Sequence, residues 1–310
     1  MSALRQVFKA SRISTSLPRR RLFRRHTSIN TVQLPQFNQP KAPFSTTGTM
    51  AHSNLNKTAL ALKALHVPGQ PVIMANVWDV ASTRTVGSLP SAKALATASY
   101  AVALANDSED ALMTLETNLA AARAIGKVAV ELEKPLSVDL QDGYGARLEE
   151  AIQGVIAAGA VGVNIEDVDK DTGVQYAPEE AAERIRKAVA VAKGEGVPDF
   201  VVNARCDTIL KGSGDFDETI QRGKLYLEAG ATTVFVIGGS GRGGLTTDEV
   251  KRLSTALDGR LNASVVFAEG KLTAKELGDI GISRISIGPQ LYFKAMQAAK
   301  AEAEKLLSRA

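Results

Sequence analysis

The stretch that decides the fold reads Pro135-Leu136-Ser137-Val138-Asp139-Leu140-Gln141-Asp142-Gly143-Tyr144-Gly145. Its short apolar run ends in two carboxylates, and a Gly-x-Gly turn follows. A buried parallel strand delivers acidic side chains to the edge of a sheet in this way, and the two glycines let the backbone turn sharply beside a ligand. The same residue types are also favoured in ordinary polar turns. The stretch therefore predicts a functional site only if other strands end in the same way.

Seven other short apolar runs occur along the chain, and amphipathic helical segments separate most of them. We expect strands around 72–75, 93–98, 136–140, 161–165, 200–204, 233–237, 264–268 and 284–287. We expect helices at 55–66, 109–126, 147–158, 178–194, 216–229, 246–257, 273–279 and 290–308. Continuous apolar strands indicate burial on both faces, as in a parallel sheet. Eight β-α alternations in about 250 residues predict a (β/α)8 TIM barrel, with an open doubly wound sheet as the alternative.

The first 50 residues differ in composition from the rest of the chain. They hold nine Lys or Arg and no Asp or Glu, whereas residues 51–310 hold the remaining 28 basic and all 33 acidic residues, a net charge of −5. Apolar and basic side chains fall on separate helical faces, with Leu4, Val7 and Phe8 on one and Arg5, Lys9 and Arg12 on the other. This predicts a disordered mitochondrial targeting presequence and linker at 1–50, with a basic tail as the alternative. Residues 51–310 are expected to form a single catalytic barrel in the mitochondrial matrix.

The rare residue types exclude several kinds of site. Cys206 is the only cysteine, so an internal disulfide and a thiolate zinc cluster are ruled out. The histidines are His26, His52 and His66, which argues against a Ser-His-Asp triad or a histidine-rich zinc site later in the chain. The mildly acidic body carries no nucleic-acid footprint, and no apolar run reaches the roughly 20 residues of a membrane span. Any metal must have oxygen ligands, which favours Mg²⁺, with Mn²⁺ or Ca²⁺ as alternatives.

Polar side chains follow most of the expected strands at their carboxyl ends. They are Asn76, Trp78, Asp79, Ser99, Tyr100, Asp139, Asp142, Glu166, Asp167, Arg205, Asp207 and Glu269. Active sites of barrels lie at this end. So many carboxylates would repel one another without a cation, so we expect a divalent metal there, with Arg205 holding an anionic substrate. Some of the acids, Asp142 and Asp167 among them, have the alternative role of helix N-caps.

Two other features leave alternatives open. The glycine-rich run 238–244 follows the sixth strand, and it suits either a phosphate cradle or a flexible loop. It matches neither a P-loop nor a dinucleotide fingerprint. Cys206 lies beside Arg205, but no histidine is near it in the sequence, so a packing role is favoured over a thiolate nucleophile.

The chain resembles the isocitrate lyase and phosphoenolpyruvate mutase superfamily over roughly residues 70–300. Five motifs in the same order carry the resemblance: Asn76-Val77-Trp78-Asp79, 139–145, Asn164-Ile165-Glu166-Asp167, Asn203-Ala204-Arg205-Cys206-Asp207 and Ile285-Ser286-Ile287-Gly288-Pro289. The resemblance implies an α/β barrel whose last helix is swapped between subunits of a homodimer or homotetramer. It also implies Mg²⁺ and small carboxylate substrates, either 2-oxo acids or 2-hydroxy di- or tricarboxylates.

The resemblance also implies roles for individual residues. Asp139 resembles the direct metal ligand, while Glu166 and Asp107 resemble ligands that act through water. The substrate would be bound by Ser99 with the N–H groups of Tyr100 and Ala101, by Arg205, and by Trp78 as a wall of the pocket. Arg205, Ser99 and Glu166 would be catalytic, because metal and arginine together stabilise a pyruvate enolate.

Two departures from the superfamily bear on the reaction. The lyases carry a Lys-x-Cys-Gly-His loop, whereas residues 168–176 hold neither cysteine nor histidine, and a phosphonomutase Lys-x-Asn pattern is not evident. Gln141 also stands where the superfamily usually has an acid. The proton donor is therefore open, with Tyr176, Lys170 and Tyr100 as chemically suitable side chains.

These observations give one main hypothesis and two alternatives. The main one is a Mg²⁺-dependent lyase that cleaves a C–C bond of a small 2-hydroxy or 2-oxo acid through a pyruvate-type enolate. The first alternative is an oxaloacetate or phosphonopyruvate hydrolase, or a phosphonomutase-type activity. The second is a non-catalytic relative that binds a carboxylate in the same site.

Overall fold

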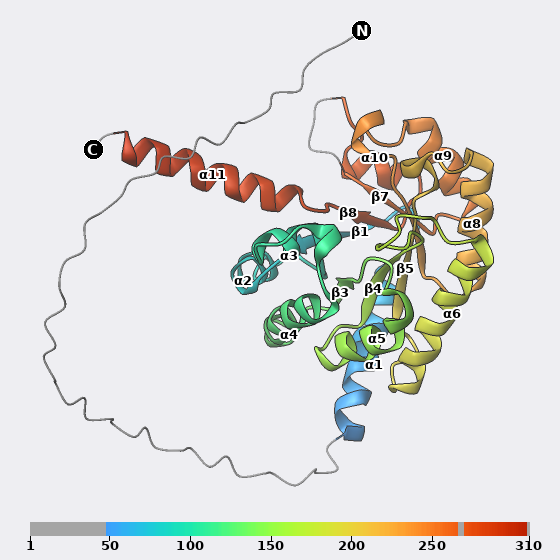
Figure 1. Cartoon of the computed structure of the whole chain (residues 1–310), viewed down its shortest axis with the longest axis horizontal. Coiled ribbons are helices and arrows are strands. Elements are labelled where there is room, and N and C mark those ends of the chain that lie inside the picture. The colour runs from blue at the N-terminus through green and yellow to red at the C-terminus, as the bar shows by residue number, and fades with distance from the viewer. Residues whose placement is uncertain (1–47, 266–269, 309–310) are drawn as a thin grey trace, which may run out of the picture. The chain divides into compact units, whose positions relative to one another are not determined.

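Eight parallel strands close into a barrel in sequence order, and β8 pairs back to β1 (Figure 1). The computed structural model describes residues 48–265 and 270–308. The strands are β1 (Val72–Val77), β2 (Leu95–Thr97), β3 (Leu136–Asp139), β4 (Gly162–Glu166), β5 (Val201–Cys206), β6 (Thr233–Val236), β7 (Leu261–Ser264) and β8 (Arg284–Ser286). This confirms the (β/α)8 TIM barrel and excludes the open doubly wound sheet.

Helices connect the strands. They are α1 (Gly48–Ala64), α2 (Val80–Gly87), α3 (Ser99–Ala105), α4 (Leu115–Glu131), α5 (Leu148–Ala157), α6 (Pro178–Gly194), α7 (Thr208–Lys211), α8 (Phe216–Glu228), α9 (Thr247–Ala256), α10 (Ala274–Asp279) and α11 (Gln290–Leu307), with 3-10 turns η1 (Asp110–Leu112), η2 (Gly145–Arg147) and η3 (Ser240–Arg242). The α2, α3 and α7 helices add to the expected pattern. All three are short, so they give little periodic signal.

Local sequence explains where several helices begin and end. Thr246 and Glu249 form a reciprocal capping box at the start of α9. Gly159 and Gly230 follow α5 and α8 with φ of +89° and +106°, a left-handed conformation that glycine adopts without the strain of a Cβ. The Ala-Gly-Ala segments at these two places are therefore helix-to-strand joints, each delivering the next barrel strand.

The position expected for the seventh strand is wrong. We expected 264–268, but β7 spans Leu261–Ser264. Asn262 interrupts the apolar pattern of the real strand, and its Nδ2 donates to Ser286 Oγ inside the barrel at 2.9 Å. Glu269 and residues 1–47 of the presequence and linker expected at 1–50 lie outside the described residues, while residues 48–50 belong to α1.

The interior of the barrel is polar, whereas aliphatic side chains fill the layer between strands and helices. The buried polar side chains of the interior include Asn76, Ser137, Asn164, Asn203, Thr233, Asn262 and Ser286. Several are joined: Asn203 Nδ2 donates to Asn164 Oδ1 at 2.7 Å, and Thr233 Oγ1 donates to Asn203 Oδ1 at 2.7 Å. Buried amides need such partners, because an unpaired polar group is costly away from water. Hydrogen bonds thus join the walls of the interior.

The last helix leads away from the barrel (Figure 1). None of its described residues is buried. Near its start, the Tyr292 ring meets Trp78 edge-on with centroids 5.3 Å apart. On β1, the side chain of Ile73 is 46% exposed, although strands of such barrels are normally covered by helices. Within the described residues, no helix combines the length and the apolar character needed to cross a bilayer.

Candidate active site

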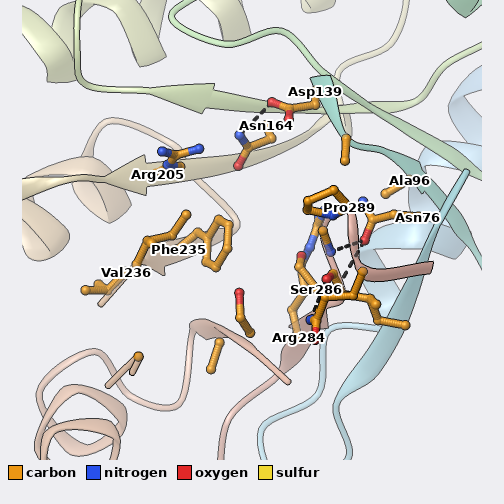
Figure 2. Close-up of a pocket in the computed structure, with 18 of the residues that line it drawn as sticks. Asn76, Ala96, Asp139, Asn164, Arg205, Phe235, Val236, Arg284, Ser286 and Pro289 are labelled. Carbon is orange, nitrogen blue, oxygen red and sulfur yellow. Dashed lines mark hydrogen bonds between the residues drawn. The ribbon is translucent and has the colours of Figure 1, made fainter. Parts of the chain in front are cut away.

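A cavity of about 650 Å³ opens among the strands, and every strand contributes to its lining (Figure 2). Asp139, Asn164 and Arg205 come from β3, β4 and β5, and Figure 2 shows them on one side of the pocket. Phe235 of β6 supplies an apolar wall. Pockets of this size suit small organic ligands.

Asp139 ends β3 and is held by three neighbouring segments. Its Oδ2 accepts from the Ser99 backbone N–H at 2.9 Å, and its Oδ1 accepts from Asn164 Nδ2 at 2.9 Å. Its own N–H donates to Thr97 Oγ1 at 2.8 Å. The two bonds to its oxygens fix the orientation of the carboxylate. The structure therefore brings the expected residues Asp139 and Ser99 into direct contact.

Arg205 is held by two carboxylates before any ligand binds. Its Nη1 lies 2.5 Å from Glu166 Oε1, while its Nε and Nη2 donate to the two oxygens of Asp207 at 2.6 and 2.8 Å. Burial raises the pKa of Glu166 and Arg205 opposes this rise, while the charge of Asp139 adds to it. A guanidinium carries five N–H donors, so two are left over for a ligand.

Asp110, which the sequence did not single out, lines the cavity in the place expected for Asp107. Asp107 is exposed, has φ of +54°, and does not line the cavity. Burial raises the pKa of the Asp110 carboxyl, and the charge of Asp139 raises it further. Asp110 therefore lies close enough to Asp139 for their charges to interact.

The side-chain amide of Gln141 is hydrogen-bonded to Asp110. Its Nε2 donates to the Asp110 backbone oxygen at 2.6 Å and to its Oδ1 at 3.1 Å, and its backbone has φ of +52°. Its buried Oε1 has no hydrogen-bond partner among the described residues. The Gln141 amide thus donates hydrogen bonds to Asp110, whereas a carboxylate at position 141 would repel the Asp110 carboxylate.

The acids fit a hydrated Mg²⁺. Within the described residues, no three His, Cys, Asp or Glu side chains gather tightly enough to ligate one ion directly. Mg²⁺ keeps several of its waters and is bound through one or two carboxylates, so direct ligation by one acid needs no such cluster. Asp139 would be the direct ligand, and Asp110 and Glu166, whose pKa values its charge raises, would bind through water.

The expected substrate cradle is only partly free. Ser99 is buried in the first turn of α3, and its N–H is used by Asp139. The Ala101 N–H donates to the Ala98 carbonyl at 3.0 Å. Tyr100 lines the cavity, is 44% exposed and packs against the Phe293 ring. Trp78 does not line the cavity.

The loop after β4 turns its functional groups away from the cavity. The Tyr176 hydroxyl donates to Asp142 Oδ2 at 2.9 Å, and Lys170 Nζ pairs with Asp171 at 2.6 Å. Neither side chain lines the cavity. Of the three suitable proton donors, only Tyr100 reaches it.

Asp142 and Asp167 are structural, but the interpretation of them as helix N-caps is wrong. Asp142 accepts from the backbone N–H groups of Tyr144 and Gly145 at 3.0 and 3.1 Å. Asp167 accepts from the Asp207 N–H at 2.9 Å and from the Tyr226 hydroxyl at 2.7 Å. They fix the turns that follow β3 and β5.

The glycine-rich loop after β6 lines the cavity and folds back on itself. A Cβ on Gly238 would lie 2.3 Å from the backbone carbon of Gly244. The Gly244 N–H donates to the Gly239 carbonyl at 2.9 Å. Gly238 at least must therefore be glycine, because the backbone of Gly244 lies too close to leave room for a Cβ atom.

Cys206 is a packing residue. It is fully buried, and its sulfur lies 3.3 Å from Thr208 Oγ1. Burial raises the pKa of its thiol to about 12, so the reactive thiolate does not form at neutral pH.

Three buried polar residues of the cavity had no assigned role in the sequence: Asn164, Asn203 and Arg284. Asn164 and Asn203 lie within β4 and β5, Arg284 is the first residue of β8, and all three line the cavity. The signal is a polar residue within a strand expected to be buried on both faces, because such a side chain must find partners inside.

Comparisons with known proteins agree with this geometry. The chain is 31% identical over 237 residues to the uncharacterized protein Rv1998c of Mycobacterium tuberculosis, covering 76% of this chain and 84% of that protein. It is 31% identical over 169 residues to the isocitrate lyase of Haloferax volcanii, covering 49% of this chain and 48% of the lyase.

Solved structures share the fold. A "putative phosphonomutase" from Burkholderia cenocepacia is 34% identical, with a TM-score of 0.73 over 81% of this chain and 99% of that one. A 2,3-dimethylmalate lyase is 24% identical, with a TM-score of 0.69 over 84% of this chain and 88% of that one. Residues 62–307 match the family model described as phosphoenolpyruvate phosphomutase. The chain therefore belongs to the phosphoenolpyruvate phosphomutase family, within a superfamily of lyases and mutases.

Proposed function

We propose that this protein is a Mg²⁺-dependent lyase that cleaves a C–C bond of a small 2-hydroxy or 2-oxo carboxylic acid through a pyruvate-type enolate. The observation that supports it most is the meeting of Asp139, Asp110 and Arg205 around one cavity at the carboxyl ends of the strands. Such a site combines a place for a cation with a fixed guanidinium, and both stabilise negative charge that develops on an enolate oxygen.

In this proposal, the residues of the site bind the substrate, hold Arg205 in place and orient Asp139. The two N–H donors of Arg205 that Glu166 and Asp207 leave over would bind the substrate carboxylate, and those acids would keep the guanidinium from turning. Ser99 and Asn164 would keep Asp139 aimed at the metal. When bound, Mg²⁺ would supply charge stabilisation of the enolate oxygen.

The proton that completes the reaction would come from Tyr100. In a retro-aldol cleavage, the hydroxyl proton of the substrate passes to a carboxylate of the site or to water, the C–O bond becomes a carbonyl, and the C–C bond breaks. The electron pair of that bond leaves with the other fragment as an enolate, which then takes up a proton at carbon. Tyr100 is the one suitable donor that lines the cavity, since Tyr176 and Lys170 face elsewhere. Its partial exposure lets it exchange that proton with solvent.

A phosphonomutase or a hydrolase of oxaloacetate or phosphonopyruvate is the second candidate. It is supported by the family description and by the 34% identity to the Burkholderia structure. A non-catalytic carboxylate-binding protein is the third. It is supported by the loop 168–176, none of whose residues lines the cavity.

We also propose that the protein assembles as a homodimer or homotetramer through α11. The exposed Ile73 on β1 and the exposed Phe293 and Met296 on α11 are apolar surface that a second copy could cover. Exchange of α11 between subunits would place this helix against the uncovered strand. A mitochondrial matrix location remains a proposal that rests on the composition of residues 1–50.

Two measurements test the proposed reaction. Enolate chemistry predicts exchange of the methyl protons of pyruvate for deuterium, seen by proton NMR only when Mg²⁺ is present. A screen of 2-hydroxy and 2-oxo acids, with pyruvate, glyoxylate and oxalate release assayed, would then identify the substrate. Binding of oxalate with Mg²⁺ but no exchange or turnover would favour the non-catalytic protein, and turnover of phosphonopyruvate alone would favour the second candidate.

A further inference from the structure

Arg284 is a charged side chain enclosed by the barrel. It opens β8, is only 2% exposed and lines the same cavity as Asp139 and Arg205. Its Nη2 lies 3.5 Å from Ser137 Oγ on β3, so the side chain reaches across the interior from β8. In Figure 2 it lies with Asn76 and Ser286, apart from Asp139, Asn164 and Arg205.

Most of this guanidinium has no partner. Its Nε and Nη1 form no hydrogen bond with any described residue, and no ion pair joins it to a described carboxylate. Burial lowers the pKa of Arg284 to about 10 against the opposing charge of Asp139, so the side chain stays charged at neutral pH. Asp139 forms no ion pair with Arg284, and a buried charge without a directly paired counter-ion is unfavourable for the folded protein. An anion beside Arg284 would remove this cost.

The groups around the Arg284 guanidinium suit an anionic ligand. Burial, and then the charge of Arg284, lower the pKa of His66, so the imidazole adds no competing positive charge. Ser137 and Ser286 line the cavity, and their hydroxyl groups can donate hydrogen bonds to an anion. A cavity of about 650 Å³ that reaches both arginines has room for one molecule with two anionic groups.

We propose that Arg284 forms a second carboxylate subsite at the inner end of the cavity, so that the ligand is a dicarboxylate. One carboxylate would bind at Arg205 beside the metal acids, and the other would reach into the barrel to Nε and Nη1 of Arg284. This inference rests on the proposed function for the first carboxylate. The Arg284 subsite itself rests on the unpaired guanidinium.

The test compares dicarboxylates with monocarboxylates of equal length. Calorimetry with Mg²⁺ would measure the Kd of oxaloacetate against 2-oxobutyrate, 2-oxoglutarate against 2-oxopentanoate, and 2-oxoadipate against 2-oxohexanoate. For at least one pair we expect the dicarboxylate to bind about tenfold or more tightly, as a charge-assisted hydrogen bond allows. Arg284→Met should reduce this preference to about threefold or less, while leaving the Kd of oxalate within about threefold.

Lys271→Met is the matched control, because Lys271 also lines the cavity but is exposed. It should retain the dicarboxylate preference. Thermal unfolding gives a second readout: Arg284→Met should melt at the same temperature or higher, since it removes an unpaired buried charge. A lower melting temperature, an unchanged preference in Arg284→Met, or equal affinity within every pair in the wild type would overturn the inference.

Bromide separates the subsite from the proposed reaction. Crystals of the full chain soaked in bromide should show an anomalous peak beside Nε and Nη1 of Arg284, and crystals of Arg284→Met should lack it. If oxalate fails to bind, the proposed function fails, and the bromide peak still supports the subsite. No peak overturns the subsite, and a peak with equal affinity for mono- and dicarboxylates assigns it to a free anion and overturns the dicarboxylate inference.

Discussion

Glu166 Oε1 and Arg205 Nη1 lie 2.5 Å apart at paired positions of β4 and β5. With Asp207 on its other edge, the guanidinium is fixed by the barrel itself rather than by a mobile loop. A rigid first contact loses little conformational freedom on binding, which is how pre-organised sites gain affinity.

Asp207→Asn should loosen Arg205. The amide keeps one acceptor oxygen but turns an N–H group toward the guanidinium, so a buried charge-assisted pair is lost. We expect about tenfold weaker oxalate binding and a loss of about 1–3 kcal/mol in the free energy of unfolding. Asp217→Asn is the control, because Asp217 pairs with Arg252 on the surface and should change stability by about 0.5 kcal/mol or less. Calorimetry and urea unfolding measure both effects, and equal losses in the two variants would contradict the prediction.

Asp110→Asn and Asp107→Asn should differ in their effect on Mg²⁺ binding. Asp110 faces the cavity and feels the charge of Asp139, whereas Asp107 is exposed and turned away. Loss of a ligand that acts through water weakens metal affinity by about tenfold or more, and we expect this only for Asp110. Asp139→Ala should abolish Mg²⁺-dependent oxalate binding. Titration calorimetry tests all three, and a larger effect at Asp107 would sink the assignment.

Gln141→Asp should make stability depend more strongly on Mg²⁺. The new carboxylate would face Asp110 in place of an amide that donates to it, so the metal-free protein should melt at a lower temperature. Added Mg²⁺ should recover most of the loss, because a ligand that binds the folded state stabilises it. Gln141→Asn removes the long amide without adding charge, and its melting temperature should respond to Mg²⁺ as the wild type does. Thermal melts in EDTA and in Mg²⁺ would decide.

His66 should make the fold sensitive to mild acid. Burial, and then the charge of Arg284, lower the pKa of the imidazole to about 3, while Nδ1 lies 2.8 Å from the Leu62 carbonyl oxygen. Since the pKa is lower in the folded than in the unfolded state, the contribution is full above about pH 6.5 and is lost as the pH falls toward 3. Between pH 7.5 and 5.5 this costs about 1.4 kcal/mol. His66→Asn should lose that much less over the same interval in urea unfolding, and identical pH profiles would refute the assignment.

Ile73→Arg should shift the protein toward the monomer. Ile73 stands exposed on β1, and a charge there would oppose burial by a second copy. Val174→Arg is the control, because Val174 is exposed on the loop after β4. Light scattering after size-exclusion chromatography should show a dimer or tetramer for the wild type and for the control. A monomeric wild type would contradict the proposed assembly.

Most of the fold was predictable, because apolar strands and capped helices alternate in the sequence. The β7 strand was misplaced because the polar Asn262, which points into the polar interior, interrupts the apolar pattern of the strand. The run at 264–268, which follows it, is more apolar. Short helices such as α3 escaped because seven residues hold too little periodicity.

The site was predictable where a residue lies at the carboxyl end of a strand. Asp139 is the last residue of β3 and Arg205 is the last but one of β5, and both line the cavity. Asp110 could not be chosen over Asp107, because the choice depends on how the chain turns between α3 and η1. Arg284 was missed because arginine usually marks a surface, and only the closed barrel shows that the side chain points inward.

The amide-lined interior of the barrel has a thermodynamic consequence. Unfolding exposes Asn164, Asn203 and Asn262 along with the aliphatic layer outside the strands. Newly hydrated polar surface lowers the heat capacity of unfolding, whereas apolar surface raises it. Calorimetry should therefore give a smaller heat-capacity change per residue than for a barrel filled with valine and isoleucine. The stability of this protein would then vary less steeply with temperature on either side of its maximum.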